Sequence, residues 1–272
     1  MSVYRIQREY FANITPHQLE EMLSVFEQDD NGDILIPYEH KGYQCNDIQV
    51  NSSNGTKAIS MFSGAGGLDI GTQLAGIPVL SSLDIFEDSV KTMQQNSFFK
   101  NTVHECGDIT KITGEHYSNL IKRENPEKLI VVGGPPCQPF SKAGYWVTNE
   151  KRNSREDPRN LIKPYFRILS DLQPDGFVLE NVESILHPSN HEAIETLAEN
   201  MERLGYRYSM LKINAAEHGI PQKRKRVFFL ASKKEIKAVL SQTQGNEKEC
   251  KANPALLPYE RVVDYIGKFD DP

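Results

Sequence analysis

The chain is poor in cysteine and contains no long hydrophobic run. Its 272 residues include four cysteines, Cys45, Cys106, Cys137 and Cys250, and no two of them form a C-x-x-C pair. This spacing argues against a zinc site and against a disulfide framework, and it fits a reducing compartment. No apolar run approaches the ~20 residues of a membrane span, and the first ten residues are too polar for a secretory signal. We therefore expect a cytoplasmic protein without a metal centre.

The chain also lacks the basic excess that is common in nucleic-acid-binding proteins. It has 31 Lys and Arg against 37 Asp and Glu, which gives a net charge of -6 and is mild evidence against DNA as a ligand. Local basic clusters are nevertheless present, a dense one at 223–226 and a looser one from Lys142 to Arg159. Such runs usually form a solvated face, so composition alone leaves the partner open.

Strands and helices alternate from Lys57 onward, whereas residues 1–56 form an N-terminal extension. The extension is expected to hold a short helix at 15–27 and a polar linker at 46–56. The rest, 57–272, is expected to be one domain. Strands are predicted at 58–62, 79–83, 129–132, 177–179, 208–213 and 227–231, and helices at 68–75, 161–172 and 194–204. This alternation predicts an α/β fold with a doubly wound, mostly parallel sheet. Its ligand site should lie beyond the carboxyl ends of the strands.

A glycine-rich loop follows the first predicted strand, Asp84 follows the second, and Asp108 follows a probable third strand that ends before Gly107. Residues 62–67, Phe-Ser-Gly-Ala-Gly-Gly, could make a tight turn that lets a ligand approach the backbone. The dinucleotide fingerprint fails because Asp69 occupies its third glycine position. Asp84 ends the second strand and could accept hydrogen bonds from ribose hydroxyls. Asp108 could accept a hydrogen bond from an adenine amino group, or it could cap a helix.

Three further motifs sit at the ends of later strands. Cys137 lies in a run of two glycines and two prolines that fixes the backbone path. A lone cysteine is usually a small buried hydrophobe, but a thiolate on a stiff turn could act as a nucleophile. Glu180 would lie beside Cys137 if their strands are neighbours, and a buried glutamate can donate a proton at neutral pH. Arg224 and Arg226 would share one face at the start of the last strand and could grip a phosphate and a base carbonyl.

Together these motifs resemble the cytosine-5 DNA methyltransferase family, in order from Lys57 to about Ile266. The resemblance is carried by residues 62–67, by Gly107-Asp108-Ile109, by Pro135-Pro136-Cys137-Gln138, by Glu180-Asn181-Val182 and by residues 222–226. It implies the Rossmann-like methyltransferase fold, S-adenosylmethionine as methyl donor, and double-stranded DNA whose target base is flipped out of the duplex.

The resemblance also assigns a role to each matching residue. Cys137 would attack C6 of cytosine while Glu180 protonates N3, which makes C5 nucleophilic toward the methyl group. Arg226 would contact the base O2 and Arg224 the phosphate, while Asn181 would brace the Pro136-Cys137 turn. The residues implied in catalysis are Cys137, Gln138, Glu180, Asn181, Arg224 and Arg226. The residues implied in cofactor binding are Phe62, Ser63, Gly64, Ala65, Gly66, Gly67, Asp84, Ile85, Asp108, Ile109 and Pro136.

The sequence departs from the family pattern after Arg226. The target-recognition domain and the final Asn-containing motif of the family are not found, although 259–267 resembles the segment that precedes that domain. Two explanations stay open: a split enzyme completed by a second polypeptide, or a truncated chain. We expect a bacterial enzyme paired with a restriction endonuclease. The alternatives are a tRNA methyltransferase and a non-catalytic cofactor-binding subunit; a nicotinamide oxidoreductase rests on the imperfect glycine loop alone.

Overall fold

The computed structural model of the chain describes residues 2–6, 27–28, 34–38, 55–136, 161–236 and 238–262. The chain divides into two compact units, one of residues 1–44 and 259–272 and the other of residues 45–258. The functional division predicted at residue 56 stays a prediction. Within the described residues, no helix is both long and apolar enough to cross a bilayer.

The smaller unit contains a three-stranded antiparallel sheet. Its strands β1 (Ser2–Ile6), β2 (Glu27–Gln28) and β3 (Ile34–Tyr38) are arranged in the order β1-β3-β2. The helix predicted at 15–27 lies outside the described residues except for its last position. At that position the prediction is wrong, because Glu27 begins strand β2.

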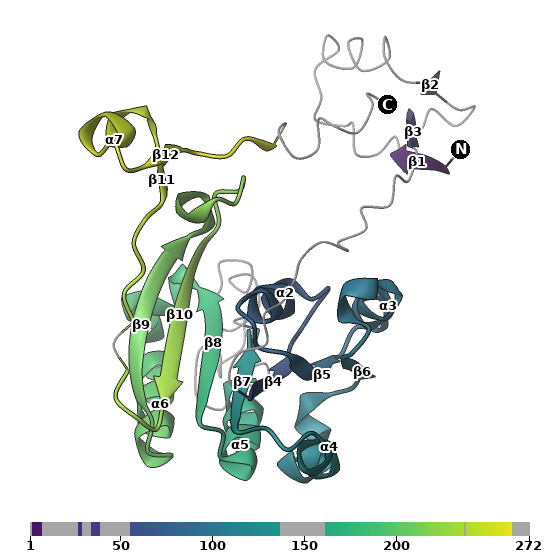
Figure 1. The fold of residues 1–272 in the computed structure, drawn as a ribbon, viewed down its shortest axis with the longest axis vertical. Coiled ribbons are helices and arrows are strands. Elements are labelled where there is room, and N and C mark those ends of the chain that lie inside the picture. Colours follow the sequence, from purple (N-terminus) through teal and green to yellow (C-terminus); the bar gives the residue numbers. More distant parts are fainter. Residues whose placement is uncertain are drawn as a thin grey trace. The chain divides into compact units, whose positions relative to one another are not determined.

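The larger unit is built on a seven-stranded sheet in the order β6-β5-β4-β7-β8-β10-β9 (Figure 1). The strands β4 to β8 are parallel to one another, and β10 runs antiparallel to both of its neighbours. The predicted mostly parallel α/β sheet is therefore confirmed. The strands are β4 (Thr56–Met61), β5 (Val79–Asp84), β6 (Val103–Cys106), β7 (Lys128–Gly133), β8 (Gly176–Val182), β9 (Arg207–Asn214) and β10 (Lys225–Ser232).

Helices cover both faces of this sheet. Figure 1 shows α2 and α3 on one side and α4, α5 and α6 on the other. The α-helices are α2 (Gly67–Leu74), α3 (Glu87–Gln95), α4 (Ser118–Glu124), α5 (Ile162–Leu172) and α6 (His191–Arg203). Short 3-10 turns connect them: η2 (Ser97–Phe99), η3 (Ile109–Lys111), η4 (Gly114–Tyr117), η6 (Glu183–Leu186), η7 (Pro188–Asn190) and η8 (Ala215–His218). After β10 the chain forms β11 (Gln244–Gly245), α7 (Glu247–Ala252) and β12 (Leu257–Pro258).

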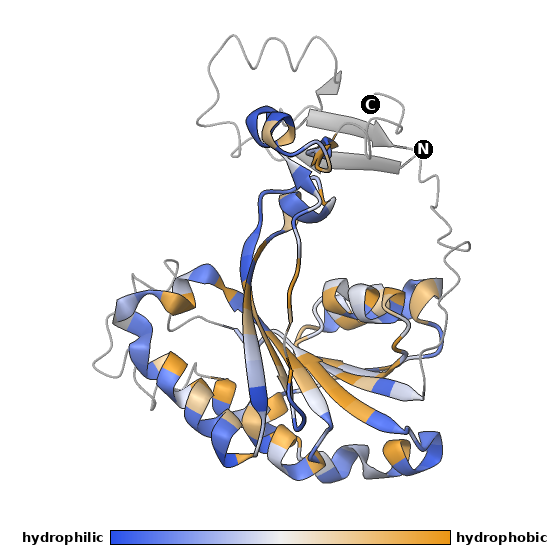
Figure 2. Cartoon of the chain, turned by 60° about the vertical axis from the view of Figure 1, so that its left-hand side comes forward, coloured by the Kyte–Doolittle hydropathy of each residue, from blue (hydrophilic) through white to orange (hydrophobic). Residues whose placement is uncertain are grey.

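The main core lies between the sheet and α5 and α6. The apolar stripe of α5 buries Tyr165, Ile168 and Leu169 against the inner strands. Tyr165 and Phe166 each meet Phe177 of β8 in an edge-on ring contact, which is the arrangement that aromatic pairs prefer. Figure 2 shows hydrophobic residues concentrated along the central strands, with mixed polarity on the helices. This packing holds the carboxyl ends of β4, β5, β7 and β8 in fixed register.

The strands and helices predicted between residues 58 and 231 are confirmed, with one consequential difference in extent, and Thr56, predicted as the end of the linker, begins β4. The strand predicted at 177–179 runs from Gly176 to Val182, so Glu180 and Asn181 lie within β8 and not beyond its end. They belong to the strand because β10 pairs with them: Phe228 stands opposite Glu180 and Val227 opposite Asn181. Conversely, β10 begins at Lys225, so Gln222 and Arg224 precede the strand.

Candidate active site

The glycine loop leaves β4 and enters α2 through an unusual backbone path. Phe62 adopts φ 57°, Gly64 φ 53° and Gly66 φ 91°. A side chain at Gly66 would collide with Phe99, whose ring lies 2.5 Å from the position of an added Cβ. Gly66 therefore combines a left-handed conformation with a close approach, and both require glycine. The result is a stiff turn at the N-terminus of α2.

Asp84 ties this loop to the end of β5. One carboxylate oxygen accepts the Gly64 N–H at 2.7 Å, and the other accepts the Phe86 N–H at 2.9 Å. Each carboxylate oxygen has two acceptor positions, so Asp84 can still accept two further hydrogen bonds from a ligand. The adjacent Ile85 and Phe86 side chains are 59% and 70% exposed. The sequence predicts Phe86 on the apolar face of the following helix together with Val90 and Met93; the helix and the burial of Val90 and Met93 are confirmed, but the placement of Phe86 is wrong, because Phe86 precedes the helix at 87–95 and is exposed.

The loop has room beside it for a ligand. A Cβ at Gly64 or Gly67 would meet no atom of the described residues within 4 Å, so the described part of the chain leaves open space along this backbone. Ser63 is buried, Ala65 is exposed, and Phe62 packs 6.5 Å from the Tyr165 ring. This combination of an open backbone edge, a carboxylate with free acceptor positions and exposed apolar side chains fits a ribose-containing ligand.

Asp108 and Ile109, which follow β6, differ in their environment: Asp108 lies at the surface and Ile109 in the core. Asp108 caps η3, and its Oδ1 accepts both the N–H and the hydroxyl of Thr110. These bonds hold the pKa of Asp108 below its usual range. The helix-cap interpretation of Asp108 is therefore present in the structure, and its second oxygen is left for another partner. The Ile109 side chain is buried in the core, so only its backbone could contact a ligand.

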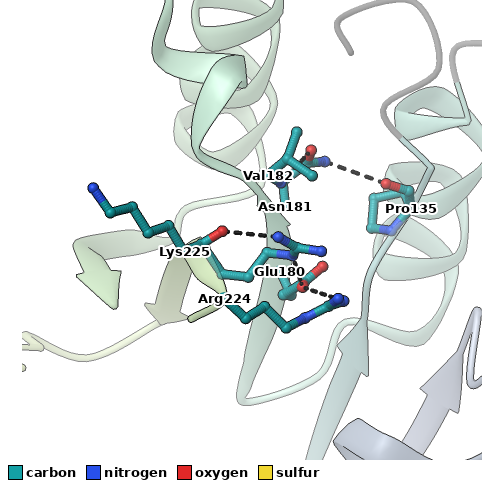
Figure 3. A network of polar contacts seen from close by, with 7 residues as sticks. Pro135, Glu180, Asn181, Val182, Arg224 and Lys225 are labelled. Atoms are coloured by element: carbon teal, nitrogen blue, oxygen red, sulfur yellow. Dashed lines mark hydrogen bonds and ion pairs between the residues drawn. The ribbon is translucent and has the colours of Figure 1, made fainter. Parts of the chain in front are cut away.

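Glu180 lies against the backbone that leads toward Cys137. Strands β7 and β8 are neighbours, as the sequence argument required. A Cβ at Gly134 would lie 3.1 Å from Glu180 Oε2, so glycine there makes space for the carboxylate. One residue further, Asn181 donates a hydrogen bond from Nδ2 to the Pro135 carbonyl at 3.2 Å (Figure 3). Its Oδ1 accepts the Val182 N–H, which fixes the amide orientation.

Two arginines approach the same carboxylate from β10 and the turn before it. Arg226 donates from Nε to Glu180 Oε1 at 2.7 Å, and an Arg224 terminal nitrogen lies 3.9 Å from that oxygen. Glu180 and Arg226 side chains are 24% and 21% exposed, while Arg224 is 51% exposed. Glu180 Oε2 accepts no hydrogen bond from any residue that the structure describes. Glu180 is therefore an ion-paired carboxylate whose Oε2 has no described hydrogen-bond partner, and the more exposed Arg224 lies beside it.

Two of the predicted catalytic residues, Cys137 and Gln138, lie outside the described residues, as does the looser basic cluster up to Arg159. Pro136 is the last described residue before them and is partly buried. One peptide bond joins it to Cys137. Within the described residues, no cluster of His, Cys, Asp and Glu side chains could hold a metal ion. The described geometry therefore brings together Gly134, Pro135, Glu180, Asn181 and Arg226.

The fold and these strand-end residues define a class, the α/β enzymes whose ligand site lies at the carboxyl edge of a doubly wound sheet. Residues 56–269 match the family model for C-5 cytosine-specific DNA methylases. The chain belongs to this family, as its sequence motifs predicted.

Known proteins similar to the chain include type II methyltransferases. M.SacI of Streptomyces achromogenes is 33% identical over 184 residues, which cover 63% of this chain and 46% of that protein. M.AquIA of a Picosynechococcus strain is 35% identical over 186 residues, which cover 65% of this chain and 72% of that protein. One solved structure, described as a DNA modification methyltransferase encoded within a prophage (E. coli), is 30% identical with a TM-score of 0.53; the match covers 65% of this chain and 46% of that one. The chain spans about half the length of the first curated relatives it matches.

Proposed function

We propose that the chain is the catalytic part of a DNA methyltransferase that transfers a methyl group to C5 of cytosine, within a restriction-modification system. The observation that carries this proposal is the ion pair between Glu180 and Arg226, formed against the Gly134–Pro135 backbone that leads into Cys137. Membership of the cytosine-5 family and the type II names of the relatives support it.

The proposed steps follow from the low reactivity of C5 in cytosine. C5 of the ring is a poor nucleophile until a covalent adduct disrupts the aromatic system. The Cys137 thiolate would form a bond to C6 while Glu180, in its protonated form, gives a proton to N3; the C5–C6 double bond becomes a C4–C5 double bond, and the ring is then an enamine with a nucleophilic C5. Attack of C5 on the methyl group would form the new C–C bond as the bond between that methyl group and the sulfur of the donor breaks. A base would then remove the C5 proton, the Cys137 sulfur would leave C6 as the C5–C6 double bond re-forms, and the N3 proton would return to Glu180.

Glu180 is suited to the proton transfer at N3. Arg226 occupies Oε1, and Oε2 faces Gly134 without a hydrogen bond from a described residue. The free oxygen can therefore face the base edge, while the bound one holds the side chain in position. Arg226 would donate to the cytosine O2 from its remaining N–H groups, and the more exposed Arg224 would meet the neighbouring phosphate.

The open edge of the glycine loop fits S-adenosylmethionine. Asp84 would accept hydrogen bonds from the ribose hydroxyls, Asp108 from the adenine amino group, and the backbone of residues 64–67 would line the methionine part. Ile85 and Phe86 would supply apolar contact. The cofactor, when bound, supplies the electrophilic methyl group.

Target recognition is proposed to come from protein outside the residues of this chain. The chain covers 46–54% of the first four curated relatives, so about half of each has no counterpart here. A second polypeptide or a longer form of the chain would supply that part. M.AquIA is a shorter relative, because a match of 186 residues covers 72% of it. DNA is favoured over tRNA as substrate by the type II names, and the complete set of Cys137, Glu180, Arg224 and Arg226 disfavours a non-catalytic subunit.

Trapping with duplex DNA that contains 5-fluorocytosine tests the proposal. Fluorine at C5 cannot leave as a proton, so the Cys137–C6 bond persists once the methyl group has been transferred. We expect a covalent protein–DNA adduct that depends on S-adenosylmethionine, resists denaturation and disappears in Cys137→Ala. Slow turnover is not an obstacle because the adduct accumulates with time.

The matched control is Cys106→Ala, because Cys106 is an exposed free cysteine at the end of β6. This variant should keep the wild-type yield. An undiminished adduct in Cys137→Ala would rule that residue out as the nucleophile. An adduct with a fluorinated tRNA in place of the duplex would favour the alternative substrate.

A further inference from the structure

The hairpin of β9 and β10 carries positive charge in an otherwise acidic chain. Residues 205–234 contain eight Lys or Arg and one Asp or Glu, a net charge of +7, whereas the whole chain carries -6. The remaining residues therefore sum to -13. The basic residues are Arg207, Lys212, Lys223, Arg224, Lys225, Arg226, Lys233 and Lys234, and the acid is Glu217. A concentration of this size on one supersecondary element indicates an anionic partner.

Part of this charge is already used inside the protein. Arg224 and Arg226 approach Glu180, and Lys233 donates to the Gln173 carbonyl and side chain. Five basic residues remain, and all five are exposed and form no ion pair with any described acid. Arg207 and Lys234 lie at the Ser232 end of the hairpin, whereas Lys212, Lys223 and Lys225 lie toward the end that holds Arg224 and Arg226. The single acid of the hairpin, Glu217, accepts a hydrogen bond from Asn214 instead. We call Lys212, Lys223 and Lys225 the lysine edge.

The strand register places two of these lysines together. Lys212 stands opposite Val227, and Lys225, two residues before Val227, stands opposite Asn214. Side chains that are opposite or two residues apart share one face of a sheet, so Lys212 and Lys225 are diagonal neighbours. β9 is the outer strand of the sheet. Like charges this close destabilise an isolated sheet slightly, and a bound anion relieves that repulsion.

The lysine edge lies beside the candidate active site but faces another way. Figure 3 shows the Lys225 side chain extending away from Glu180, while Arg224 points toward it. Glu180 stands opposite Phe228, which alternates in direction with Val227 and therefore with Lys225. The basic run at 223–226 therefore places side chains on both faces of β10: Arg226 faces Glu180, and Lys225 faces away from it.

We propose that Lys212, Lys223 and Lys225 bind phosphate groups of the DNA duplex beside the flipped cytosine, which extends the DNA contact around the β9 edge of the sheet. This inference rests on the proposed function for the identity of the partner. Lysine suits the role because it contacts phosphate as a point charge without demanding one geometry. Such contacts position a duplex without reading its sequence. They would therefore add affinity for DNA without adding selectivity for its sequence.

The test is the salt dependence of DNA binding by the full chain. We compare the wild type, a variant with Lys212→Gln, Lys223→Gln and Lys225→Gln, and a control with Lys100→Gln, Lys128→Gln and Lys163→Gln. The control lysines are exposed on other elements, so both variants lose the same charge. Binding to a random-sequence duplex is followed by fluorescence anisotropy between low and physiological salt.

Each phosphate contact contributes about 0.9 to the slope of log K against log salt. The lysine-edge variant should lose roughly 2 to 3 from that slope and bind more weakly at every sequence, while the control keeps the wild-type slope. An unchanged slope in the lysine-edge variant, or an equal change in both variants, overturns the inference. Tighter, lysine-dependent binding of tRNA than of duplex DNA would overturn the assignment of the partner.

Failure of the proposed function gives a different result. The same three proteins are assayed for the S-adenosylmethionine-dependent adduct with 5-fluorocytosine DNA. A wild type that forms the adduct, with salt slopes unaffected by the lysine changes, contradicts the lysine edge alone. A wild type that forms no adduct, even together with the protein that supplies target recognition, contradicts the proposed activity, whatever the slopes.

Discussion

At the scale of single residues, Asp69 is the most unusual acid in the described chain. It is fully buried at the start of α2, where Ser60 donates a hydrogen bond to Oδ2 at 2.8 Å and Oδ1 has no hydrogen-bond partner. Burial raises the pKa of Asp69 from 3.8 to about 6, and the nearby Asp84 charge adds to this. Asp69, which replaces the third glycine of the dinucleotide fingerprint, is therefore a buried carboxyl whose ionisation lowers the stability of the folded state.

Asp69 makes stability depend on pH in a direction opposite to that of most acids. Its folded-state pKa, about 6, lies above the unfolded value near 3.8. Between these values the folded state binds more protons, so stability rises as pH falls from about 6 to 4. Above pH 6 the folded protein carries a buried charge.

Asp69→Asn should therefore stabilise the protein at pH 8, because the amide keeps an acceptor for Ser60 without the charge. The gain should be on the order of 1–3 kcal/mol, since one pKa unit corresponds to ~1.4 kcal/mol, and it should vanish near pH 4. Urea unfolding curves of wild type and variant across this range give the difference. Asp88→Asn on the surface of α3 is the control and should show little pH-dependent gain. A variant less stable than wild type at pH 8 would mean that the carboxylate has a stabilising partner.

At the scale of elements, the glycine loop and α2 offer a matched pair of glycines. Gly66 has φ 91° and no space for a Cβ, whereas Gly71 lies inside α2 and a Cβ there would meet no atom within 4 Å. The same chemical change should therefore have opposite effects at positions five residues apart.

Gly66→Ala should lower the free energy of unfolding by at least about 1–2 kcal/mol, from the left-handed backbone and the contact with Phe99. Gly71→Ala should raise it by roughly 0.5–1 kcal/mol because alanine favours helix. Thermal unfolding followed by circular dichroism measures both. If both variants lost a similar amount of stability, the expected difference between the left-handed loop position Gly66 and the helical position Gly71 would be contradicted.

The elements themselves were largely predictable because the hydrophobic pattern follows burial. Strands such as β7 and helices such as α5 have apolar residues at the positions that the core covers, and their types follow from that pattern. The error at β8 arose where the strand becomes polar: Glu180 and Asn181 carry no hydrophobic signal. The long-range pairing with β10 keeps them in the sheet.

The site could be located from the sequence, but its internal contacts could not. The motifs placed Glu180, Arg224 and Arg226 near one another. The ion pair between Glu180 Oε1 and Arg226, and the space that Gly134 leaves for Oε2, depend on the register of strands that are 46 residues apart in the chain. The separation of Lys225 from the site likewise needed the antiparallel pairing of β8 with β10.

At the scale of the whole molecule, we expect chemistry and target choice to be separable. The described residues provide a glycine loop, a carboxylate–arginine pair and a basic hairpin, and in the proposed function these features would contact a base and backbone phosphates without distinguishing neighbouring base pairs. Sequence is read through base edges in the grooves. The match with this chain covers about half the length of its first relatives, and we expect the chain to bind DNA in a largely sequence-independent way.

The isolated chain should therefore methylate duplex DNA weakly or not at all, and it should discriminate less than about tenfold between duplexes of different sequence. A specific DNA-binding protein typically discriminates by 10³ or more. The measurement is transfer of labelled methyl groups, with binding curves on the same duplexes, first for the chain alone and then with the protein that supplies target recognition. Addition of that protein should raise both the rate and the discrimination, because it holds the target base at Glu180 and Arg226. Robust sequence-specific methylation by the isolated chain would contradict this division, because recognition would then have to reside within these 272 residues.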